Sequence, residues 1–492
     1  MQQYLFLSKK SVFLLFSTFF LFHSCKNDDP FNDPTKTNQT VNKWIHENMD
    51  LYYYWRTDLP AFNKSNAFPE EYFNTLINND DRFSAIYDDY VSISNQLKGV
   101  SASEVGFKFQ LYLESPSSDN VIAVVLYTKK GTDAFTKGIK RGDIIRKING
   151  QQLTKTNYSQ VIANLSNETP SVKLTFANKI DGVYVDKPEV EITKSRQFAE
   201  NPLYLDTIYT TPSKKIGYFV YHFFTNDAGD QSMSYDLKLN AAMAKFASEN
   251  VTELIVDFRY NSGGAISSAV HLSSMLVPNL TNNKLFSYTK YNQNFIDYFN
   301  SAEYKRKYND NPMETKFATT ISVASPKPVT VPLNNIGNKL QRIFFITSNR
   351  TASASEMVIN GLKPFVTCVL IGDTTVGKNV GSILINDTEN VSNKWAIMPI
   401  VLRYYNANNE SNFTYGFAPD VVMADDTNYE LGDVREGMLA KALAIITGKQ
   451  TVKSVNVSQP IFGQPLKVNL PSQLSTLIID KESVRSIFES KN

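Results

Sequence analysis

One segment sets the fold class of this chain: Arg342–Lys378, with the sequence RIFFITSNRTASASEMVINGLKPFVTCVLIGDTTVGK. It opens with a short apolar run over 342–347, which predicts a buried strand. Small and then apolar residues at helical spacing follow over 352–362, and a second apolar run over 365–371 predicts another strand. Strand, tight turn, helix and strand in succession predict an α/β unit.

The turn between strand and helix presents Ser353 near a helix N-terminus. The unpaired backbone N–H groups of a first helical turn can stabilise negative charge, so a serine at this position is a candidate nucleophile. A structural interpretation stands beside it. Ser353 and Glu356 are spaced as in a capping box, where both side chains only satisfy the helix terminus. The local pattern leaves both interpretations open.

The wider pattern resembles a known family. TASASE at 351–356, with Lys378 placed 25 residues after Ser353 (378 − 353), is similar to the C-terminal processing (tail-specific) serine peptidases. The resemblance implies a Ser–Lys dyad, with Ser353 as nucleophile and Lys378 as general base. It also implies supporting roles for Glu356, one helical turn after the serine on the same face, and for Thr375, which would orient the lysine amine.

A lysine can act as the base only when it is neutral, so the pKa of Lys378 must fall from its usual value of about 10.4. Burial away from carboxylates would lower it, and the uncharged turn over 374–377 permits such burial. The other candidate bases after residue 24 are three histidines, and the sequence alone brings none of them to the serine: His46, His222 and His271.

One position departs from the family pattern. Tail-specific proteases have an acidic residue 11 positions after the serine, whereas this chain has Pro364 there (353 + 11). The departure keeps a second function class open, namely a catalytically weak or inactive relative that binds peptide tails as an adaptor. Retention of both Ser353 and Lys378 argues for the enzyme.

A second motif, DFRYNSGG at 257–264, resembles the D-L-R-x-N-x-G-G loop of the same family. Glycines let backbone N–H groups approach a substrate carbonyl closely. By resemblance, the oxyanion hole would combine the N–H of Ala354 with that of Gly263 or Gly264. YGFAPD at 415–420 resembles the closing turn of the family.

Periodicity near two over about 100–195 predicts a β-rich domain with a strand at 121–127 and a helix at 158–165. GIKRGDIIRKING at 138–150 resembles the most recognisable part of a PDZ domain. The resemblance implies that the domain accepts an extended peptide as an added strand and captures its terminal carboxylate in a backbone nest, here at Gly106-Phe107. The alternatives are a lid, or a small β-domain that only packs on its neighbour.

The first 24 residues are interpreted as a secretory signal. A basic pair precedes an apolar run over 12–22 that is too short to span a bilayer comfortably. Cys25 directly afterwards resembles the lipidated residue of a bacterial lipoprotein, and the charged start at 26–29 resembles the surface-export signal of Bacteroidota-type lipoproteins. This implies a lipid anchor in the cell envelope, at the outer membrane, facing the periplasm or the surface. An ordinary signal peptide cut nearby is the alternative.

The remaining chain divides by composition into four further parts. They are a flexible tether at 25–41, an aromatic-rich helical region at 42–95, an α/β peptidase domain at 200–448 and a C-terminal extension at 449–492. A final helix is predicted over 431–446. The predicted fold class is therefore multidomain α/β, and the family resemblance implies a ClpP/crotonase-like catalytic domain.

Charge and cysteine content exclude several function classes. Without the first 24 residues, which hold two of the 50 basic residues, 48 basic residues face 48 acidic ones, so nothing indicates nucleic-acid binding. No Cys/His cluster has metal-ligand spacing, and no cofactor is implied. The predicted function is a serine endopeptidase that cleaves proteins presented through accessible C-terminal tails. A glycan-binding surface lipoprotein is a further alternative that draws only on the signal and the aromatic content.

Overall fold

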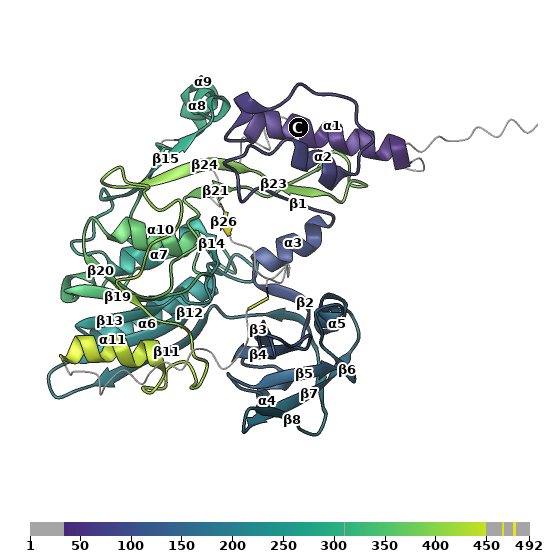
Figure 1. Ribbon diagram of the computed structural model, residues 1–492. Coiled ribbons are helices and arrows are strands. Elements are labelled where there is room, and N and C mark those ends of the chain that lie inside the picture. The colour runs from purple at the N-terminus through teal and green to yellow at the C-terminus, as the bar shows by residue number, and fades with distance from the viewer. Residues whose placement is uncertain (1–33, 309, 449–464, 467–475, 479–492) are drawn as a thin grey trace, which may run out of the picture.

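The computed structural model describes residues 34–308, 310–448, 465–466 and 476–478. The predicted signal segment and Cys25 lie outside these ranges. Within them, no helix combines the length and the apolar character needed to cross a membrane. Figure 1 shows three parts: an N-terminal region at the top, an α/β body on the left, and a small β-rich part at the lower right.

The N-terminal region is mostly helical, as predicted. Its elements are α1 (Pro34–Tyr52), η1 (Arg56–Asp58), α2 (Pro69–Thr75), β1 (Ala85–Tyr87) and α3 (Tyr90–Leu97). Helix α1 already begins at Pro34, so the predicted tether over 25–41 is wrong for its second half. Proline suits the first turn of a helix. The helix is held because apolar residues spaced by four are buried in the main core: Val41, Ile45 and Met49.

Residues 100–199 form a small β-rich unit with its own hydrophobic core, which we call the β-domain. Its elements are β2 (Val100–Glu104), β3 (Phe107–Leu113), β4 (Val121–Thr128), α4 (Asp133–Thr136), β5 (Ile144–Ile148), β6 (Gln151–Gln152), α5 (Tyr158–Ile162), η2 (Ala163–Leu165), β7 (Ser171–Ile180), β8 (Val183–Asp186), β9 (Val190–Thr193) and β10 (Ser195–Ala199). The main sheet has the order β3-β4-β5-β7-β8, so β3 lies at its edge. The predicted strand at 121–127 and helix at 158–165 are present as β4 and α5–η2.

The α/β body is built on a six-stranded sheet with the order β11-β12-β13-β19-β20-β25, parallel throughout except for β11. Its strands are β11 (Leu203–Thr210), β12 (Lys215–Tyr221), β13 (Glu253–Asp257), β19 (Arg342–Thr347), β20 (Thr367–Gly372) and β25 (Val421–Val422). Its helices are α6 (Ser234–Ser248), α7 (Ile266–Leu276), α10 (Ala354–Leu362) and α11 (Gly437–Thr447). The α/β unit predicted from 342–378 is therefore present, with α10 and β20 each beginning two residues later than predicted.

The last helix is shorter than the sequence indicates. The predicted span was 431–446, whereas α11 begins at Gly437. Glu436 acts as its N-cap, because its side chain accepts a hydrogen bond from the Leu439 N–H at 3.0 Å. The residues before it form a turn instead of a first helical turn.

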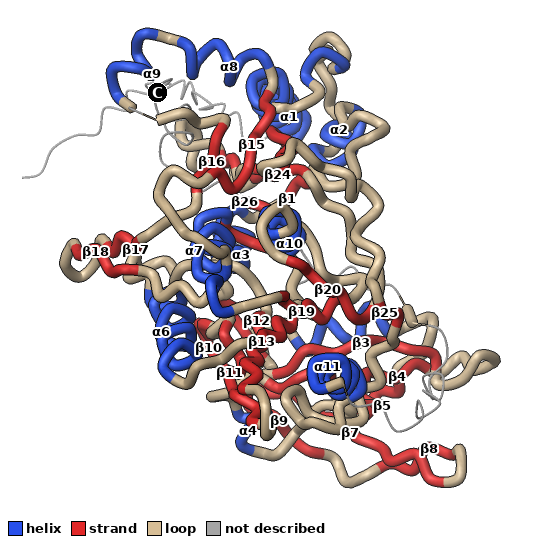
Figure 2. Tube along the Cα trace, turned by 90° about the vertical axis from the view of Figure 1, so that its left-hand side faces the viewer, coloured by secondary structure: helices blue, strands red, loops and turns tan. Residues whose placement is uncertain are grey.

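A second six-stranded sheet covers the helices on the other side. Its order is β14 (Gly263–Ala265), β26 (Thr476–Ile478), β21 (Val380–Ser382), β24 (Ile400–Asn406), β15 (Leu285–Tyr291) and β16 (Glu314–Lys316). Figures 1 and 2 both show α7 and α10 between the two sheets. The remaining elements are peripheral: α8 (Gln293–Asn300), α9 (Ala302–Lys307), β17 (Thr320–Val323), β18 (Val329–Pro332), η3 (Gly337–Lys339), β22 (Ile385–Asn386) and β23 (Ala396–Met398).

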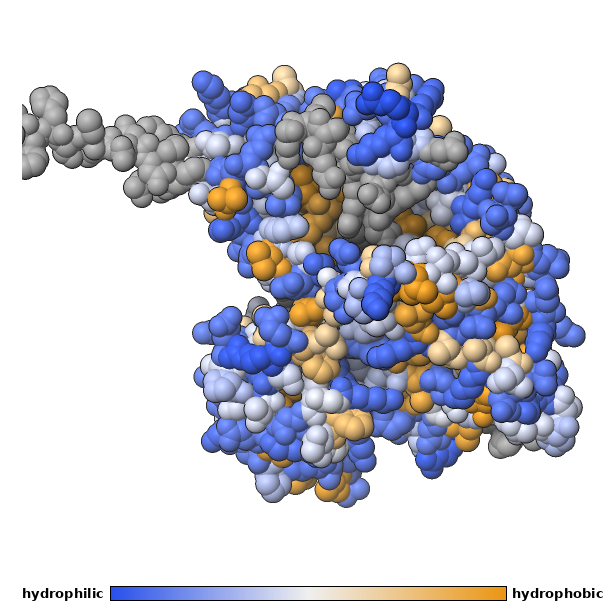
Figure 3. All heavy atoms as spheres, turned by 180° about the vertical axis from the view of Figure 1, so that it is seen from behind, coloured by the Kyte–Doolittle hydropathy of each residue, from blue (hydrophilic) through white to orange (hydrophobic). Residues whose placement is uncertain are grey.

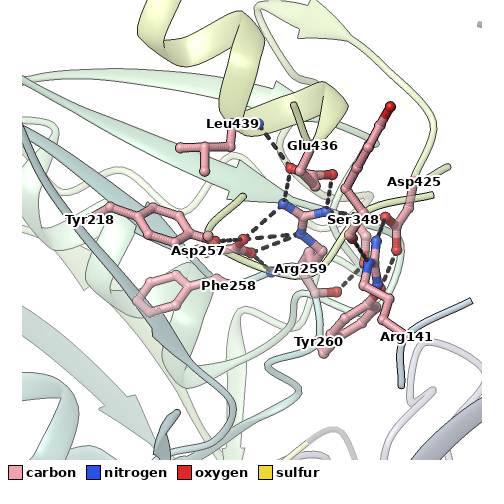
Figure 4. A network of polar contacts seen from close by, with 12 residues as sticks. Arg141, Tyr218, Asp257, Phe258, Arg259, Tyr260, Ser348, Asp425, Glu436 and Leu439 are labelled. Atoms are coloured by element: carbon pink, nitrogen blue, oxygen red, sulfur yellow. Dashed lines mark hydrogen bonds and ion pairs between the residues drawn. The ribbon is translucent and has the colours of Figure 1, made fainter. Parts of the chain in front are cut away.

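A buried charge network fixes the β-domain against the body (Figure 4). At its centre, the Arg259 guanidinium lies 2.8 Å from Asp257, 2.6 Å from Glu436 and 3.1 Å from Asp425. Arg141 of the β-domain pairs with the same Asp425. Its guanidinium also donates to the carbonyl oxygen of Leu126 at 2.9 Å and to that of Tyr429, likewise at 2.9 Å. The DFR part of the motif at 257–264 therefore has a structural role at the domain joint.

Candidate active site

Ser353 stands at the start of α10, in a backbone conformation with φ +60° and ψ −111°. This conformation is strained for a residue with a side chain, and such strain in proteins gathers at functional sites. Ser353 is fully buried. Its Oγ has no hydrogen-bond partner within the described part of the chain, which is unusual for a buried hydroxyl. Ser353 and Glu356 stand in capping-box positions, but the serine hydroxyl itself makes no hydrogen bond there.

Glu356 is the group that caps the helix instead. Its Oε2 accepts hydrogen bonds from the backbone N–H of Ser353 at 2.7 Å and of Lys378 at 2.8 Å. Its Oε1 accepts from the Gly377 N–H at 2.7 Å and from the Thr375 hydroxyl at 2.5 Å. An ionised carboxylate has about four acceptor sites, so all are used. The capping interpretation therefore explains Glu356 and leaves the Ser353 hydroxyl unexplained.

Lys378 is also fully buried, and burial lowers its pKa to about 7. Two carboxylates act in the opposite direction, those of Asp81 and Glu356. The sequence predicted burial away from carboxylates, and this part of the prediction is wrong, because desolvation lowers the pKa although both acids are near. The Phe83 ring contributes to the apolar surroundings, with its centroid 5.2 Å from the lysine Nζ. A large fraction of Lys378 is therefore neutral near neutral pH.

The described hydrogen bonds of Thr375 go to groups other than the lysine amine. Its hydroxyl donates to Glu356 and accepts from the Phe417 N–H at 2.8 Å. Both hydrogen bonds hold the loop that carries Lys378, rather than the lysine amine itself. Thr375 is therefore a positioning residue that acts through Glu356.

The predicted oxyanion donors differ in their availability. Ala354 is the first residue of α10, where backbone N–H groups lack intrahelical partners. The Gly263 N–H, in contrast, donates to the Asn261 side chain at 2.9 Å and is engaged within the protein. Gly264 has φ +139°, and a Cβ there would lie 1.9 Å from the Phe224 carbonyl oxygen, so only glycine fits. Gly264 pairs with Leu477 of β26, so Ala354 and Gly264 become the better pair of candidates once β26 has moved away.

The predicted nest at Gly106-Phe107 is closed in this structure. Gly106 is buried, and its N–H donates to the Glu104 carboxylate at 2.8 Å. Phe107 already belongs to β3, where it pairs with Thr128 of β4. The Gly106 N–H is thus engaged within the protein and is not open to the carboxylate of a peptide.

Several residues of the site carried no signal in the sequence. Arg82 of the N-terminal region donates to the Gly377 carbonyl oxygen at 2.9 Å, across 295 positions of sequence. The Tyr404 hydroxyl lies 3.3 Å from the carbonyl oxygens of both Ser353 and Lys378 and donates to them in a shared hydrogen bond. Tyr404 lies on the regular strand β24, most of whose residues are buried, so no local pattern distinguishes it from its neighbours.

The alternative bases have other described partners. His46 contacts the Pro60 carbonyl oxygen at 3.0 Å. His222 lies at the joint with the β-domain, 3.5 Å from Glu200, and burial lowers its pKa. His271 Nδ1 is 2.6 Å from Asp236 Oδ2. Among the described residues, no group of three or more His, Cys, Asp or Glu side chains is arranged to hold a metal ion.

The missing acidic residue would not touch the nucleophile. Pro364 follows the end of α10, whereas Ser353 precedes its start. The nine residues of the helix separate the two by about 13 Å at 1.5 Å per residue. An acid at position 364 would therefore act on the serine hydroxyl only over a distance, and Pro364 alone gives no reason to expect an inactive site.

A cavity of about 280 Å³ lies between α7, the start of α10 and the second sheet. Met357, one helical turn after Ser353, forms part of its wall, as does Tyr404. The rest of the lining comes chiefly from α7, β15, β16 and β24, and it mixes apolar side chains such as Ile266 and Leu402 with charged ones such as Glu314 and Lys316.

Comparisons with known proteins support the family. Residues 215–423 match the model of peptidase family S41, and residues 40–85 match the peptidase S41 N-terminal domain. The crystal structure of a candidate S41 protease from Bacteroides fragilis is similar at 24% identity and a TM-score of 0.64, covering 83% of this chain and 97% of that chain. The photosystem II D1 C-terminal processing protease is similar at 17% identity and a TM-score of 0.43, covering 79% and 93%.

No curated protein was found to match the chain. The structural similarity to the Bacteroides fragilis protein shows a shared fold, and the two family matches fall on separate parts of the sequence. Residues 215–423 are therefore similar to the peptidase domain of family S41, and residues 40–85 are similar to its N-terminal domain.

Proposed function

We propose that this chain is a serine endopeptidase in which Ser353 and Lys378 form the catalytic dyad. The observation that carries the proposal is the carboxylate of Glu356. It binds the backbone of the nucleophile and the backbone of the base at the same time, at 2.7 and 2.8 Å. One buried group therefore sets the position of both, which is the preorganisation that nucleophilic catalysis requires.

The proposed cycle moves one proton and one acyl group. Neutral Lys378 takes the hydroxyl proton of Ser353 while the serine Oγ attacks the peptide carbonyl carbon. The N–H groups of Ala354 and Gly264 stabilise the oxyanion that forms. When the C–N bond breaks, Lys378 returns the proton to the leaving amine. Water then hydrolyses the acyl-enzyme, with Lys378 again as the base.

The cavity lined by Met357 and Tyr404 supports a pocket for the substrate side chain next to the cleaved bond. Recognition of substrates through C-terminal tails is proposed for the β-domain, whose edge strand β3 suits the addition of an extended peptide. The sequence resemblance to PDZ domains supports this assignment.

Secretion and lipid attachment at Cys25 complete the proposal, and they rest on the sequence alone. The apolar run before the cysteine supports them. Cell fractionation tests this part, because the full chain should appear with membranes and the Cys25→Ala variant with the soluble fraction. Equal distribution of the two would contradict the anchor.

The catalytic proposal is tested by cleavage of an unfolded protein with an apolar C-terminus. Ser353→Ala and Lys378→Ala should each abolish cleavage, whereas Lys363→Ala should not, because Lys363 is exposed at the opposite end of α10. Cleavage that survives Ser353→Ala would mean that another residue is the nucleophile. An inert wild type that still binds the tail would favour the adaptor.

A further inference from the structure

We propose that the C-terminal segment of this chain is its own ligand, because it occupies in cis the strand positions that a substrate peptide would need. Residues 465–466 pair with the edge of the β-domain, and residues 476–478 form β26 beside the catalytic loops. The inference deepens the proposed function, since it assumes that the site around Ser353 binds extended peptides.

The first docking point is the edge strand β3. Pro465 forms an antiparallel bridge with Tyr112, and the Leu466 N–H donates to the Leu111 carbonyl oxygen at 3.0 Å. The side chain of Gln110 donates to the Leu466 carbonyl oxygen, also at 3.0 Å. An edge strand presents unpaired backbone groups, and addition of an extended segment satisfies them.

The Leu466 side chain adds an apolar contact to this backbone pairing. It packs against the core of the β-domain together with Phe109 of β3 and Tyr158 of α5. The bound segment is internal, because 26 residues of sequence follow Leu466 (492 − 466). This fits the closed state of the turn at Gly106, whose N–H is already bound to Glu104.

The second docking point lies beside the catalytic loops. Residues 476–478 run parallel to Gly263–Ala265, and Ile478 also pairs with Ser382 of β21. The strand β14 contains Gly264, the candidate oxyanion donor, and β21 begins two residues after Lys378 (380 − 378). The C-terminal segment is therefore an interior strand of the second sheet, between the two loops that would hold a substrate. Figure 1 shows β26 in yellow at this place, beside α10.

Because the proposed dyad is buried, a part of the chain must move before a substrate can reach it. Ser353 and Lys378 are both fully buried, so a substrate carbonyl reaches them only after some segment moves away. In Figure 3 the surface is indented between the β-domain and the N-terminal region above it, with apolar residues on both sides of the notch. Among the described elements, β26 is the one whose backbone lies along the path between β14 and β21.

Because the C-terminal segment is part of the same chain, it competes strongly with a free peptide for these positions. A ligand on the same chain has an effective concentration in the millimolar range when its linker can span the sites. A free peptide of moderate affinity must therefore compete against it, and weakening either docking point should favour the free peptide.

The test uses the full chain in the Ser353→Ala background, with a fluorescent synthetic peptide of the sequence at 461–480 as the probe. Leu466→Asp places a charge against the core of the β-domain and should release the segment. The probe should then bind to this variant at least about tenfold more tightly than to the parent. Val391→Asp is the matched control, because it places the same charge at an exposed apolar residue outside both docking points, and it should bind the probe like the parent. Thermal unfolding confirms that each variant is folded.

A second variant keeps the proposal testable if Leu466→Asp does not fold. Gln110→Ala removes the hydrogen bonds of this side chain to the carbonyl oxygens of Leu466 and Leu111 and should strengthen probe binding by a smaller factor. Equal binding by all folded variants would overturn the inference. Because binding is measured without a nucleophile, this result is distinguishable from failure of the catalytic proposal, which would appear as absence of cleavage in chains that still bind the probe.

Discussion

One lysine is buried at the joint between the β-domain and the body, and another is buried at the candidate active site. The pKa values of these two lysines are shifted in opposite directions. Lys129 lies 2.6 Å from Glu104 and 2.8 Å from Glu200, and these carboxylates raise its pKa although burial opposes them. Around Lys378 burial prevails over the carboxylates and lowers the pKa to about 7. The same residue type is thus a permanent charge at one place and, in the proposed mechanism, a proton acceptor at the other.

The comparison predicts opposite effects of replacing each lysine by methionine, and this is the largest effect we expect. Lys378→Met should lower kcat/KM by about a hundred- to ten-thousandfold and leave stability unchanged or higher. Lys129→Met should cost about 3–5 kcal/mol of unfolding free energy, because two buried carboxylates lose their cation. Denaturant titration and cleavage assays measure both. If Lys378→Met destabilised the protein as strongly as Lys129→Met, Lys378 would be a structural cation.

The pH dependence sharpens the same comparison. Because neutral Lys378 is the base, kcat/KM should rise with pH, reach half its plateau near the Lys378 pKa of about 7, and then stay level. Between about pH 7 and the unfolded value of about 10.4 the unfolded chain binds more protons at this group, so its contribution to stability rises with pH. The stability advantage of Lys378→Met over wild type should therefore be largest below about pH 7 and shrink as pH rises across this window. A rate profile that is flat from pH 6 to 9 would contradict the assignment.

Replacement of Asp81 is a finer test of the opposing effects of burial and carboxylates on the pKa of Lys378. Asp81 raises the pKa of this lysine, so Asp81→Asn should move the rise of the pH–rate profile to lower pH. The same substitution at the exposed neighbour Asp80 is the control and should leave the profile in place. An unchanged or upward-shifted profile in Asp81→Asn would show that this carboxylate does not act on the base.

The smallest effect is expected at Thr375. Thr375→Val removes one of the four donors to Glu356 and should lower kcat by about tenfold without moving the pH profile. Thr374→Val, next to it in the chain, is the matched control. A shifted profile would instead support the direct contact with the lysine amine that the family resemblance implied.

Local periodicity was enough to predict the elements of the site but not its connections. The strand at 342–347 was predicted with its observed bounds, and the helix after it begins within two residues of the prediction. These elements are determined by residues close together in the sequence, so the hydrophobic pattern predicts them. The contact of Arg82 with Gly377 depends on two segments 295 residues apart, and no local pattern records it.

The hydrogen-bond partners of single backbone N–H groups could not be predicted from local pattern either. Gly263 and Gly264 are adjacent and identical in the sequence, yet the structure engages only the first with Asn261. Burial and partner choice decide which donor is available, and both arise from tertiary packing. For the same reason the C-terminal extension had no interpretable pattern, although two of its pieces pair with strands far away.

The shared carboxylate of Asp425 has a consequence for the modularity of the family. Arg141 belongs to the β-domain and Arg259 to the body, and both guanidinium groups contact this one acid. An exchange of the segment 100–199 against that of a relative would preserve the joint only if the incoming module carries a matching arginine. Recombination, natural or in the laboratory, should therefore succeed only when positions 141 and 425 are inherited together.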